Sequence, residues 1–320
     1  MLPEENKIYL ADCLKFLKTM PDKSVDLFIL DPPYYKVVSQ EWDKQWFTIE
    51  EYINWCKSWL FEVGRVSKWS TSVWLFGFSY QLIQLFSILT DNGFNFRQQI
   101  MVNKGMQAVA GRTSNKLKMF PTATESIFFF HKDARDHIRD LLQSEQQRLG
   151  LIGKQINEHL GKAITGGGTY SCIASLKKPK EHRSYPTKQD WRKLSEIMNL
   201  PAYEDVVYSF NIIKGLTDVW NDINFYDRKV KKIHETQKPE KLIDRLILSS
   251  SNEGDLVCDP FMGSGTTAVS CMKNNRRYIG CEMDQEYFDK IEDRIINVKK
   301  EIHEREQKKI SGDVTSSLYY

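Results

Sequence analysis

One stretch near the C-terminus decides the fold: DLVCDPFMGSGTT, residues 255–267. Its apolar part, Leu256–Cys258, predicts a buried strand, and Gly265–Lys273 predicts the helix that follows. The glycines between them let the backbone turn sharply and approach a ligand closely, and a helix N-terminus favours a carboxylate or phosphate. The next predicted strand, at 278–281, ends at Glu282, 23 residues after the second aspartate of the stretch. In dinucleotide-binding folds an acid at about this distance binds ribose hydroxyls.

The spacing of the glycines limits the ligand. The turn is not GxGxxG, which disfavours a nicotinamide cofactor, and it is not GxxxxGK[ST], which excludes a P-loop. The combination of strand, turn, helix, strand and acid favours a nucleoside ligand that carries a ribose and no polyphosphate. S-adenosylmethionine fits this description. The alternative is that the turn is only a structural one.

Predicted strands and helices alternate over most of the chain. Strands are predicted at residues 7–11, 25–30, 72–76, 96–102, 125–130, 256–258 and 278–281. Helices are predicted at 13–20, 49–66, 80–89, 238–250, 265–273 and from 284 onward. This alternation predicts an α/β protein built on a doubly wound, mostly parallel, seven-stranded sheet.

A second motif, Asp31-Pro32-Pro33-Tyr34, follows the buried strand at 25–30. Open α/β sheets bind ligands at the carboxyl ends of their strands. The prolines fix the backbone, so the Asp31 carboxylate and the Pro32 carbonyl can converge on one point beside the flat ring of Tyr34. The alternative for this motif alone is a rigid loop.

These two acceptors suit an exocyclic amine of a nucleic-acid base. The lone pair of such an amine is delocalised into the ring, and its protons are too weakly acidic for prior removal by a carboxylate. Acceptors on both N–H bonds pull the nitrogen toward a tetrahedral form, and the freed lone pair can attack a methyl sulfonium in line. The base must first leave the duplex, and stacking on Tyr34 offsets part of the cost.

Residues 131–230 interrupt the alternation and predict an inserted domain. Within it, residues 177–193 hold seven Lys and Arg against two acids, a local charge of +5 in a chain of net charge +3. Such a patch favours a polyanionic partner, the alternative being a solvated charged surface. Lysine and arginine would contact phosphates, beside the aromatic residues Tyr170, Tyr185 and Trp191. The candidate DNA-binding residues are Lys177, Lys178, Lys180, Arg183, Lys188, Arg192 and Lys193. The glycine-containing, basic segment 104–118 is predicted to be a mobile loop that closes over the flipped base.

The motifs resemble those of the amino-methylating DNA methyltransferases. The resemblance rests on DPPY at 31–34, HETQKP at 234–239 and DPFMGSGTT at 259–267. This order is similar to that of the β group, in which the chain is circularly permuted. The resemblance implies a Rossmann-like methyltransferase fold in which the N-terminal strand lies beside the strand that ends at Glu282. It also implies that the inserted domain recognises the DNA target.

Four parts of the chain follow from this resemblance. Residues 1–130 would be the catalytic part, 131–230 the target recognition domain, 231–295 the cofactor-binding part and 296–320 a charged C-terminal helix and tail. The implied catalytic residues are Asp31, Pro32, Pro33 and Tyr34. The implied contacts to S-adenosylmethionine are Asp12, Thr236, Lys238, Asp259, Phe261, Gly263, Ser264, Gly265, Thr266 and Glu282. Among these, Asp12 would contact the adenine, Glu282 the ribose and Lys238 the carboxylate of the cofactor.

The identity of the target base depends on Asp31. Adenine-methylating members tend to carry DPPY and cytosine-N4 members SPPY, so adenine N6 in double-stranded DNA is expected and cytosine N4 is the alternative. More distant alternatives are a methyltransferase for RNA or a protein amide, and a non-catalytic DNA-binding module. Carbon-5 methylation of cytosine needs a cysteine nucleophile, typically after a proline, and no cysteine here follows one.

The remaining expectations concern partners and location. The resemblance raises a homodimer and a cognate restriction endonuclease as partners. Six scattered cysteines without metal-ligand spacing predict no metal site and suit a reducing cytosol. No apolar run approaches the ~18 residues of a membrane span, and the N-terminus lacks the features of a secretory signal. A cytoplasmic protein without membrane contact is expected.

Overall fold

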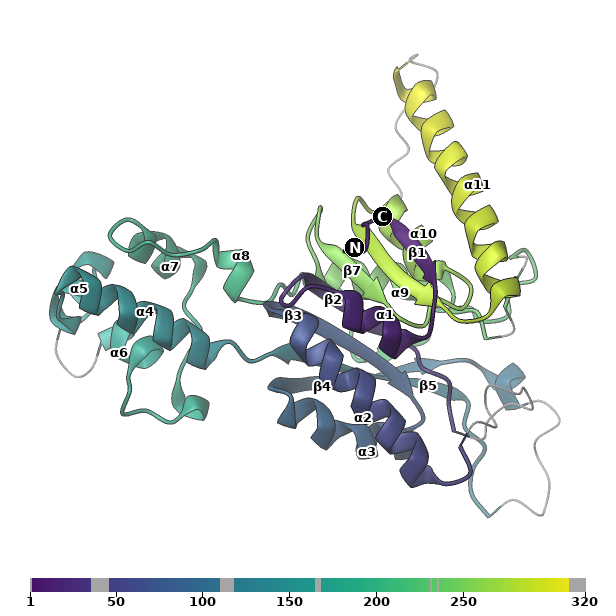
Figure 1. Cartoon of the computed structure of the whole chain (residues 1–320), viewed down its shortest axis with the longest axis horizontal. Helices are drawn as coiled ribbons and strands as arrows, with labels where there is room; N and C mark the ends of the chain where they lie inside the picture. Colours follow the sequence, from purple (N-terminus) through teal and green to yellow (C-terminus); the bar gives the residue numbers. More distant parts are fainter. Residues whose placement is uncertain are drawn as a thin grey trace.

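The computed structural model describes residues 2–35, 46–109, 118–164, 168–230, 232–234 and 236–310. Its centre is an eight-stranded sheet in the order β1-β8-β7-β2-β3-β5-β4-β6 (Figure 1). The strands are β1 Lys7–Leu10, β2 Val25–Leu30, β3 Ser67–Gly77, β4 Phe94–Asn103, β5 Thr124–Lys132, β6 Val219–Trp220, β7 Leu256–Asp259 and β8 Arg277–Glu282. Neighbouring strands pair in parallel, except that β5 is antiparallel to both β3 and β4. The seven predicted strands are present, and the two-residue β6 adds an eighth.

Helices cover both faces of the sheet, as the doubly wound prediction requires. The helices are α1 Cys13–Thr19, α2 Ile49–Val66, α3 Ser79–Asp91, α4 Arg135–Leu149, α5 Gly153–Leu160, α6 Gly168–Ala174, α7 Lys188–Ser195, α8 Tyr203–Val206, α9 Glu240–Ser250, α10 Thr266–Lys273 and α11 Gln285–Ile310. Residues of β2 alternate between two cores: Phe28 packs with α1, α2 and α3, whereas Ile29 packs with α9, α10 and α11. This alternation is the two-residue period of a strand that is buried on both faces.

The N-terminal strand completes the sheet beside the strand that ends at Glu282. In β1, Leu10 is the register partner of Glu282, and the Ala11 N–H donates to the Glu282 carbonyl at 2.9 Å. The predicted place of the N-terminal strand, beside the strand that ends at Glu282, is therefore confirmed. It brings the loop after β1 and the loop after β8 to the same edge of the sheet.

The inserted region forms a second helical body to one side of the sheet in Figure 1, and Trp69 of β3 packs against its core. Its core is built from α4 to α8 and runs from Ala134 to Val207. The predicted boundary at 230 is wrong in this respect, because β6 pairs with β4 and the side chains of Trp220, Ile223 and Phe225 join the main core. The short helix α6 begins at Gly168, the last of the consecutive glycines in this region.

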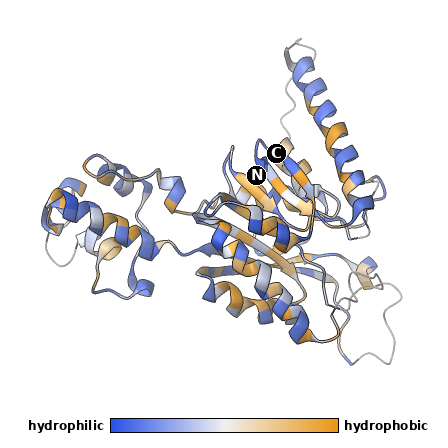
Figure 2. Cartoon of the chain, viewed as in Figure 1, coloured by the Kyte–Doolittle hydropathy of each residue, from blue (hydrophilic) through white to orange (hydrophobic). Residues whose placement is uncertain are grey.

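The last helix, α11, crosses the predicted boundary between residues 295 and 296 without a break. Its first half packs on the sheet through Ile291 and Ile295, and its second half extends beyond the body of the protein (Figures 1 and 2). The hydropathy colours show why: the second half is mostly hydrophilic and has no apolar stripe wide enough to bury. Of the charged helix and tail predicted at 296–320, residues 311–320 lie outside the described residues.

No helix in the described part of the chain is both long and apolar enough to span a membrane. Within the same ranges, no cluster of His, Cys, Asp and Glu has the geometry of a metal site. All six cysteines are unpaired, and five of them are buried.

Candidate active site

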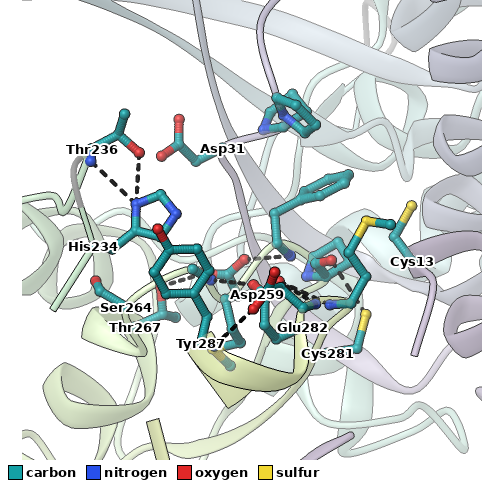
Figure 3. A pocket seen from close by; sticks show the side chains of 18 of the residues that line it. Cys13, Asp31, His234, Thr236, Asp259, Ser264, Thr267, Cys281, Glu282 and Tyr287 are labelled. Atoms are coloured by element: carbon teal, nitrogen blue, oxygen red, sulfur yellow. Dashed lines mark hydrogen bonds between the residues drawn. The ribbon is translucent and has the colours of Figure 1, made fainter. Parts of the chain in front are cut away.

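A cavity of about 290 Å³ lies at the carboxyl ends of β1, β8, β7 and β2, and Figure 3 shows some of the side chains that line it. This volume is near the lower end of small-molecule sites, which run from roughly 300 to 1,000 Å³. All four residues of the Asp-Pro-Pro-Tyr motif line it, together with every predicted cofactor residue except Gly265. Two motifs more than 220 residues apart in sequence therefore share one cavity.

The glycine turn has the backbone geometry that the sequence predicts. Gly263 and Gly265 both have positive φ, at 54° and 71°. A Cβ on Gly265 would lie 2.6 Å from the Ile291 side chain of α11, so packing as well as conformation requires glycine there. A Cβ on Gly263 would meet only the Phe261 carbonyl, at 3.8 Å. The missing side chain of Gly263 therefore leaves space on the cavity side of the turn.

Glu282 ties the turn to the neighbouring strand. Its Oε2 accepts the Gly263 N–H at 2.8 Å, and its Oε1 accepts the Met283 and Asp284 N–H groups at 2.9 and 3.0 Å. A carboxylate has about four lone-pair sites, so Oε2 keeps acceptor capacity for a hydroxyl in the cavity. On the adjacent strand end, Asp12 caps α1 by accepting the Lys15 N–H at 3.0 Å.

Asp259 is buried at the end of β7, directly beneath the turn. Its carboxylate accepts the Phe261 N–H at 2.9 Å and the Thr267 hydroxyl at 2.5 Å. Burial raises the pKa of Asp259 to about 7, against the opposing effect of these two hydrogen bonds. Asp259 therefore has a structural role in shaping the turn as well as a place in the cavity wall.

The remaining predicted cofactor residues line the cavity but already have partners. The Thr236 N–H and hydroxyl are 3.1 and 3.0 Å from His234 Nδ1, and the His234 ring lies 4.3 Å from that of Tyr287 (Figure 3). The Ser264 and Thr266 hydroxyls are 2.9 Å apart, and Arg294 of α11 donates to the Ser264 carbonyl at 2.7 Å. These contacts hold the segments on either side of the cavity in place.

Lys238 differs from the expectation drawn from its motif. Its Nζ is 2.6 Å from Asp31 Oδ2 and 3.6 Å from Glu125 Oε1, so it faces the carboxylates near the second motif and not an open space for a cofactor carboxylate. Burial lowers the pKa of Lys238, but Asp31 and Glu125 together bring it above its ordinary value. Lys238 is therefore charged and held at the Asp31 end of the cavity.

Tyr34 is also engaged through its hydroxyl. The hydroxyl oxygen is 2.9 Å from Asp31 Oδ1 and 2.8 Å from Glu125 Oε1, and the ring makes an edge contact with Phe78 at 5.2 Å between centroids. Burial, Asp31 and Glu125 raise the pKa of Tyr34 well above its ordinary value, so the phenol keeps its proton.

Glu125, the first buried residue of β5, was absent from the sequence-based candidates. Lys104 donates to its Oε2 at 2.8 Å, in addition to the contacts of Tyr34 and Lys238 with its Oε1. Burial would raise the pKa of Glu125, but Lys238 and Lys104 bring it below its ordinary value. The signal in the sequence was an acid at the start of a strand that is otherwise apolar, ESIFFF at 125–130.

The charges around the cavity fit S-adenosylmethionine, whose sulfonium is cationic. The described residues that line the cavity include Asp12, Asp31, Glu282 and Asp284, together with Asp259, whose pKa is raised to about 7; they also include one lysine and no arginine. This acidic lining repels polyphosphates and attracts a cation such as the sulfonium, and acids at strand ends can also bind the hydroxyls of a ribose. The space left by Gly263 and the aromatic walls of Trp46, Trp55 and Phe261 agree with a nucleoside ligand.

The basic residues of the inserted region fall into two groups. Arg183 is 5% exposed, pairs with Asp136 and donates to the Lys178 carbonyl at 2.7 Å, so the prediction that it contacts DNA is wrong. Tyr170 and Trp191 are likewise buried, in the core of the insertion. Several of the predicted lysines have partners within the protein: Lys180 with Asp133, Lys188 with Glu204, Lys193 with the Leu160 carbonyl and Lys178 with Cys172.

Lys177 and Arg192 are the exposed members of the set for which the described part of the chain shows no ion pair. They are the strongest of the predicted DNA-contacting residues. Of the loop predicted at 104–118, residues 110–117 lie outside the described ranges.

Comparison with known proteins identifies the family. The DNA methylase family model (N6_N4_Mtase) matches residues 25–293. The chain is 27% identical over 317 residues to the Type II methyltransferase M.HinfI of Haemophilus influenzae, covering 92% of this chain and 69% of that one. It is 29% identical to the Type II methyltransferase M1.MboII of Moraxella bovis, covering 89% and 94%.

Solved structures show the same fold. The M1.HpyAVI–SAM complex is 20% identical, with a TM-score of 0.53 over 90% of this chain and 98% of that one. The PvuII DNA methyltransferase, described as cytosine-N4-specific, is 16% identical, with a TM-score of 0.54 over 93% and 92%. With the family match over most of its length, the chain belongs to the DNA methylase family and is an S-adenosylmethionine-dependent DNA methyltransferase.

Proposed function

We propose that the enzyme methylates the N6 amino group of adenine in double-stranded DNA, after the base has been flipped out of the duplex. The observation that carries this proposal is the single cavity that holds the glycine turn at one end and Asp31 at the other. A methyl donor bound at the turn and an amine bound at Asp31 would then lie side by side, without a covalent enzyme intermediate.

At the turn, Glu282 would hold the ribose and Asp12 the adenine of S-adenosylmethionine, while Asp259, Phe261 and Gly263 would surround its methionine part. The carboxyl ends of β1, β7 and β8 support this assignment, because they place these residues around one end of the cavity. Bound there, S-adenosylmethionine supplies a methyl group on a sulfonium that departs as a neutral thioether.

At the other end, Asp31 and the Pro32 carbonyl would accept the two N–H bonds of the target amine. The nitrogen lone pair then forms the new N–C bond, and the surplus proton leaves the nitrogen afterwards, with Asp31 as the nearest carboxylate. The locked Pro32-Pro33 backbone keeps the two acceptors at a fixed separation. Asp31 instead of serine in this motif favours adenine over cytosine N4.

We further propose that the inserted region recognises the DNA target. Its exposed Lys177 and Arg192 support this proposal, because unpaired surface cations can replace the counterions of phosphates. The body formed by α4 to α8 stands to one side of the sheet, as a clamp on a duplex would (Figure 1). Lys180, Lys188 and Lys193 would contribute after exchanging their present partners.

A homodimer is also proposed. Phe61 on α2 and Tyr80 and Ile83 on α3 are large hydrophobic residues that are more than 60% exposed on two helices packed against each other. A second copy of the chain would cover them, and sedimentation velocity would show the dimer. That relatives are named Type II methyltransferases supports a cognate restriction endonuclease and a cytoplasmic enzyme, which remain predictions.

The test uses the purified protein with tritiated S-adenosylmethionine and unmethylated DNA. The expected result is labelled DNA whose digestion releases N6-methyladenine. Label in N4-methylcytosine would overturn the choice of base, and the absence of label despite cofactor binding would overturn transfer to DNA. Asp31→Ala is expected to lower transfer at least ~100-fold while cofactor binding stays within about 2-fold, because its carboxylate serves the amine and not the nucleoside.

A further inference from the structure

Two carboxylates meet at the hydroxyl of Tyr34, and each of them is paired with a lysine. The carboxylates are those of Asp31, which pairs with Lys238, and Glu125, which pairs with Lys104. The two carboxylates and two ammonium groups balance in charge, and the exposed fractions of their side chains are 22% or less. A balanced, largely buried set of this kind has more than one arrangement of its hydrogen bonds.

The arrangement in the structure keeps Asp31 occupied. Its Oδ1 faces the Tyr34 hydroxyl at 2.9 Å and its Oδ2 faces Lys238 Nζ at 2.6 Å. A phenol has only one proton, yet the Tyr34 hydroxyl lies equally close to Glu125 Oε1, at 2.8 Å. Asp31 and Glu125 therefore compete for the same two donors, the phenol and the ammonium group of Lys238.

We infer that Glu125 is a positioning residue that frees Asp31 for the target amine. When the amine binds, the Tyr34 proton turns to Glu125, and Lys238 moves the short distance from Asp31 to Glu125, from which its Nζ is 3.6 Å away. Asp31 then loses two donors that compete with the amine. This inference rests on the proposed role of Asp31 as acceptor for the amine.

The position of Glu125 suits this role. It pairs in register with Val102 at the start of β5, a strand held on both sides by β3 and β4, so its backbone cannot follow the movement of Lys238. Lys104 fixes its Oε2 at 2.8 Å and leaves Oε1 toward Tyr34 and Lys238. Without the charge of Glu125, Asp31 would be the only close carboxylate of Lys238 among the described residues. Lys238 would then hold Asp31 more tightly and compete more strongly with the amine for it.

The experiment measures steady-state methyl transfer by the full-length protein carrying Glu125→Gln, alone and together with Lys238→Gln. Glu125→Gln is expected to lower kcat about 10- to 100-fold and to leave the KM values for S-adenosylmethionine and DNA within about 2-fold. The KM values stay because Lys238 competes with the amine for Asp31 only after both substrates have bound. In the Lys238→Gln background the same substitution is expected to lower kcat by less than about 3-fold, because the competing cation is gone.

Glu62→Gln is the matched control, because Glu62 is a half-buried glutamate that pairs with Arg65 on α2, away from the cavity. It is expected to keep the wild-type kcat. Should Glu125→Gln not fold, Glu125→Asp is compared in the same two backgrounds, with the same coupling expected. An equal loss of kcat in both backgrounds, or a kcat within about 2-fold of wild type after Glu125→Gln, would overturn the inference while the proposed function stands. Wild-type protein that does not label adenine would overturn the proposed function itself.

Discussion

Asp259 gives the most quantitative prediction, because its buried carboxyl titrates near neutral pH. Burial raises its pKa from 3.8 to about 7, so the folded protein binds this proton more tightly than the unfolded chain does. The stabilising contribution of the proton is complete below pH 3.8 and is lost as the pH rises through 7. Asp259→Asn removes this titration and keeps the shape of the side chain.

The size of the effect follows from the two pKa values. At about 1.36 kcal/mol for each pH unit, a carboxyl that titrates near 7 instead of 3.8 accounts for roughly 4 kcal/mol of unfolding free energy. About 2.5 kcal/mol of this falls between pH 5 and pH 8. For 320 residues, at about 2.1 cal/mol/K per residue, the change corresponds to about 4 °C in Tm.

The assay is thermal unfolding of the wild type and Asp259→Asn at pH 5, 6, 7 and 8 in constant ionic strength. The Asn amide can still accept the Phe261 N–H through its oxygen and donate to the Thr267 hydroxyl oxygen through its nitrogen, so both partner residues keep a hydrogen bond to this side chain. The wild type is expected to lose about 4 °C more than the variant across this range. Asp91→Asn, an exposed carboxyl at the end of α3, is the control and should keep the wild-type slope. Parallel slopes for wild type and Asp259→Asn would refute the assignment of a raised pKa to Asp259.

Two further pairs of substitutions test the fold and the inserted region. Gly280→Ala would place a Cβ 2.0 Å from the Asp259 carbonyl oxygen, so β7 and β8 must separate; a loss of about 1–3 kcal/mol in urea unfolding is expected, whereas Gly64→Ala, with its nearest contact at 3.4 Å, should not destabilise. A wild-type midpoint for Gly280→Ala would contradict the close approach of the strands. Arg192→Ala is expected to weaken DNA binding and to reduce the slope of log K against log salt by about 0.9 without a change in Tm. Arg183→Ala should instead lower Tm, because the buried Arg183 side chain would lose its packing and its ion pair with the partly exposed Asp136. A changed salt slope with unchanged Tm would reverse the two assignments.

Local patterns in the sequence were sufficient for most helices and strands. The helix predicted at 49–66 coincides with α2, which begins after a capping box formed by Thr48 and Glu51. The limits of the inserted body were not predictable in the same way. β6 has only two residues and exists because Met101 and Val102 of β4 pair with it, a contact that no local pattern in residues 207–230 indicates.

For the site, the sequence determined which residues meet at the cavity but not how their polar groups are shared. Each motif places an acid or a glycine at the carboxyl end of a strand. Parallel strands bring their carboxyl ends to one edge of the sheet. The shared cavity therefore followed from the positions of the two motifs relative to the predicted strands. The same reasoning could not distinguish the exposed Arg192 from the buried Arg183, since both belong to one basic run.

By itself, then, the sequence determined the α/β sheet, the place of the N-terminal strand in it and the family. Strand periodicity is a property of neighbouring residues, and the order of the motifs can be read along the chain without knowledge of the fold. Only the tertiary structure decided that Lys238 pairs with Asp31, 207 positions away, and that Glu125 and Asp31 contend for the Tyr34 hydroxyl. The physical reason is that a buried charge takes whichever partner the packing brings within about 3 Å, and sequence separation does not limit that choice.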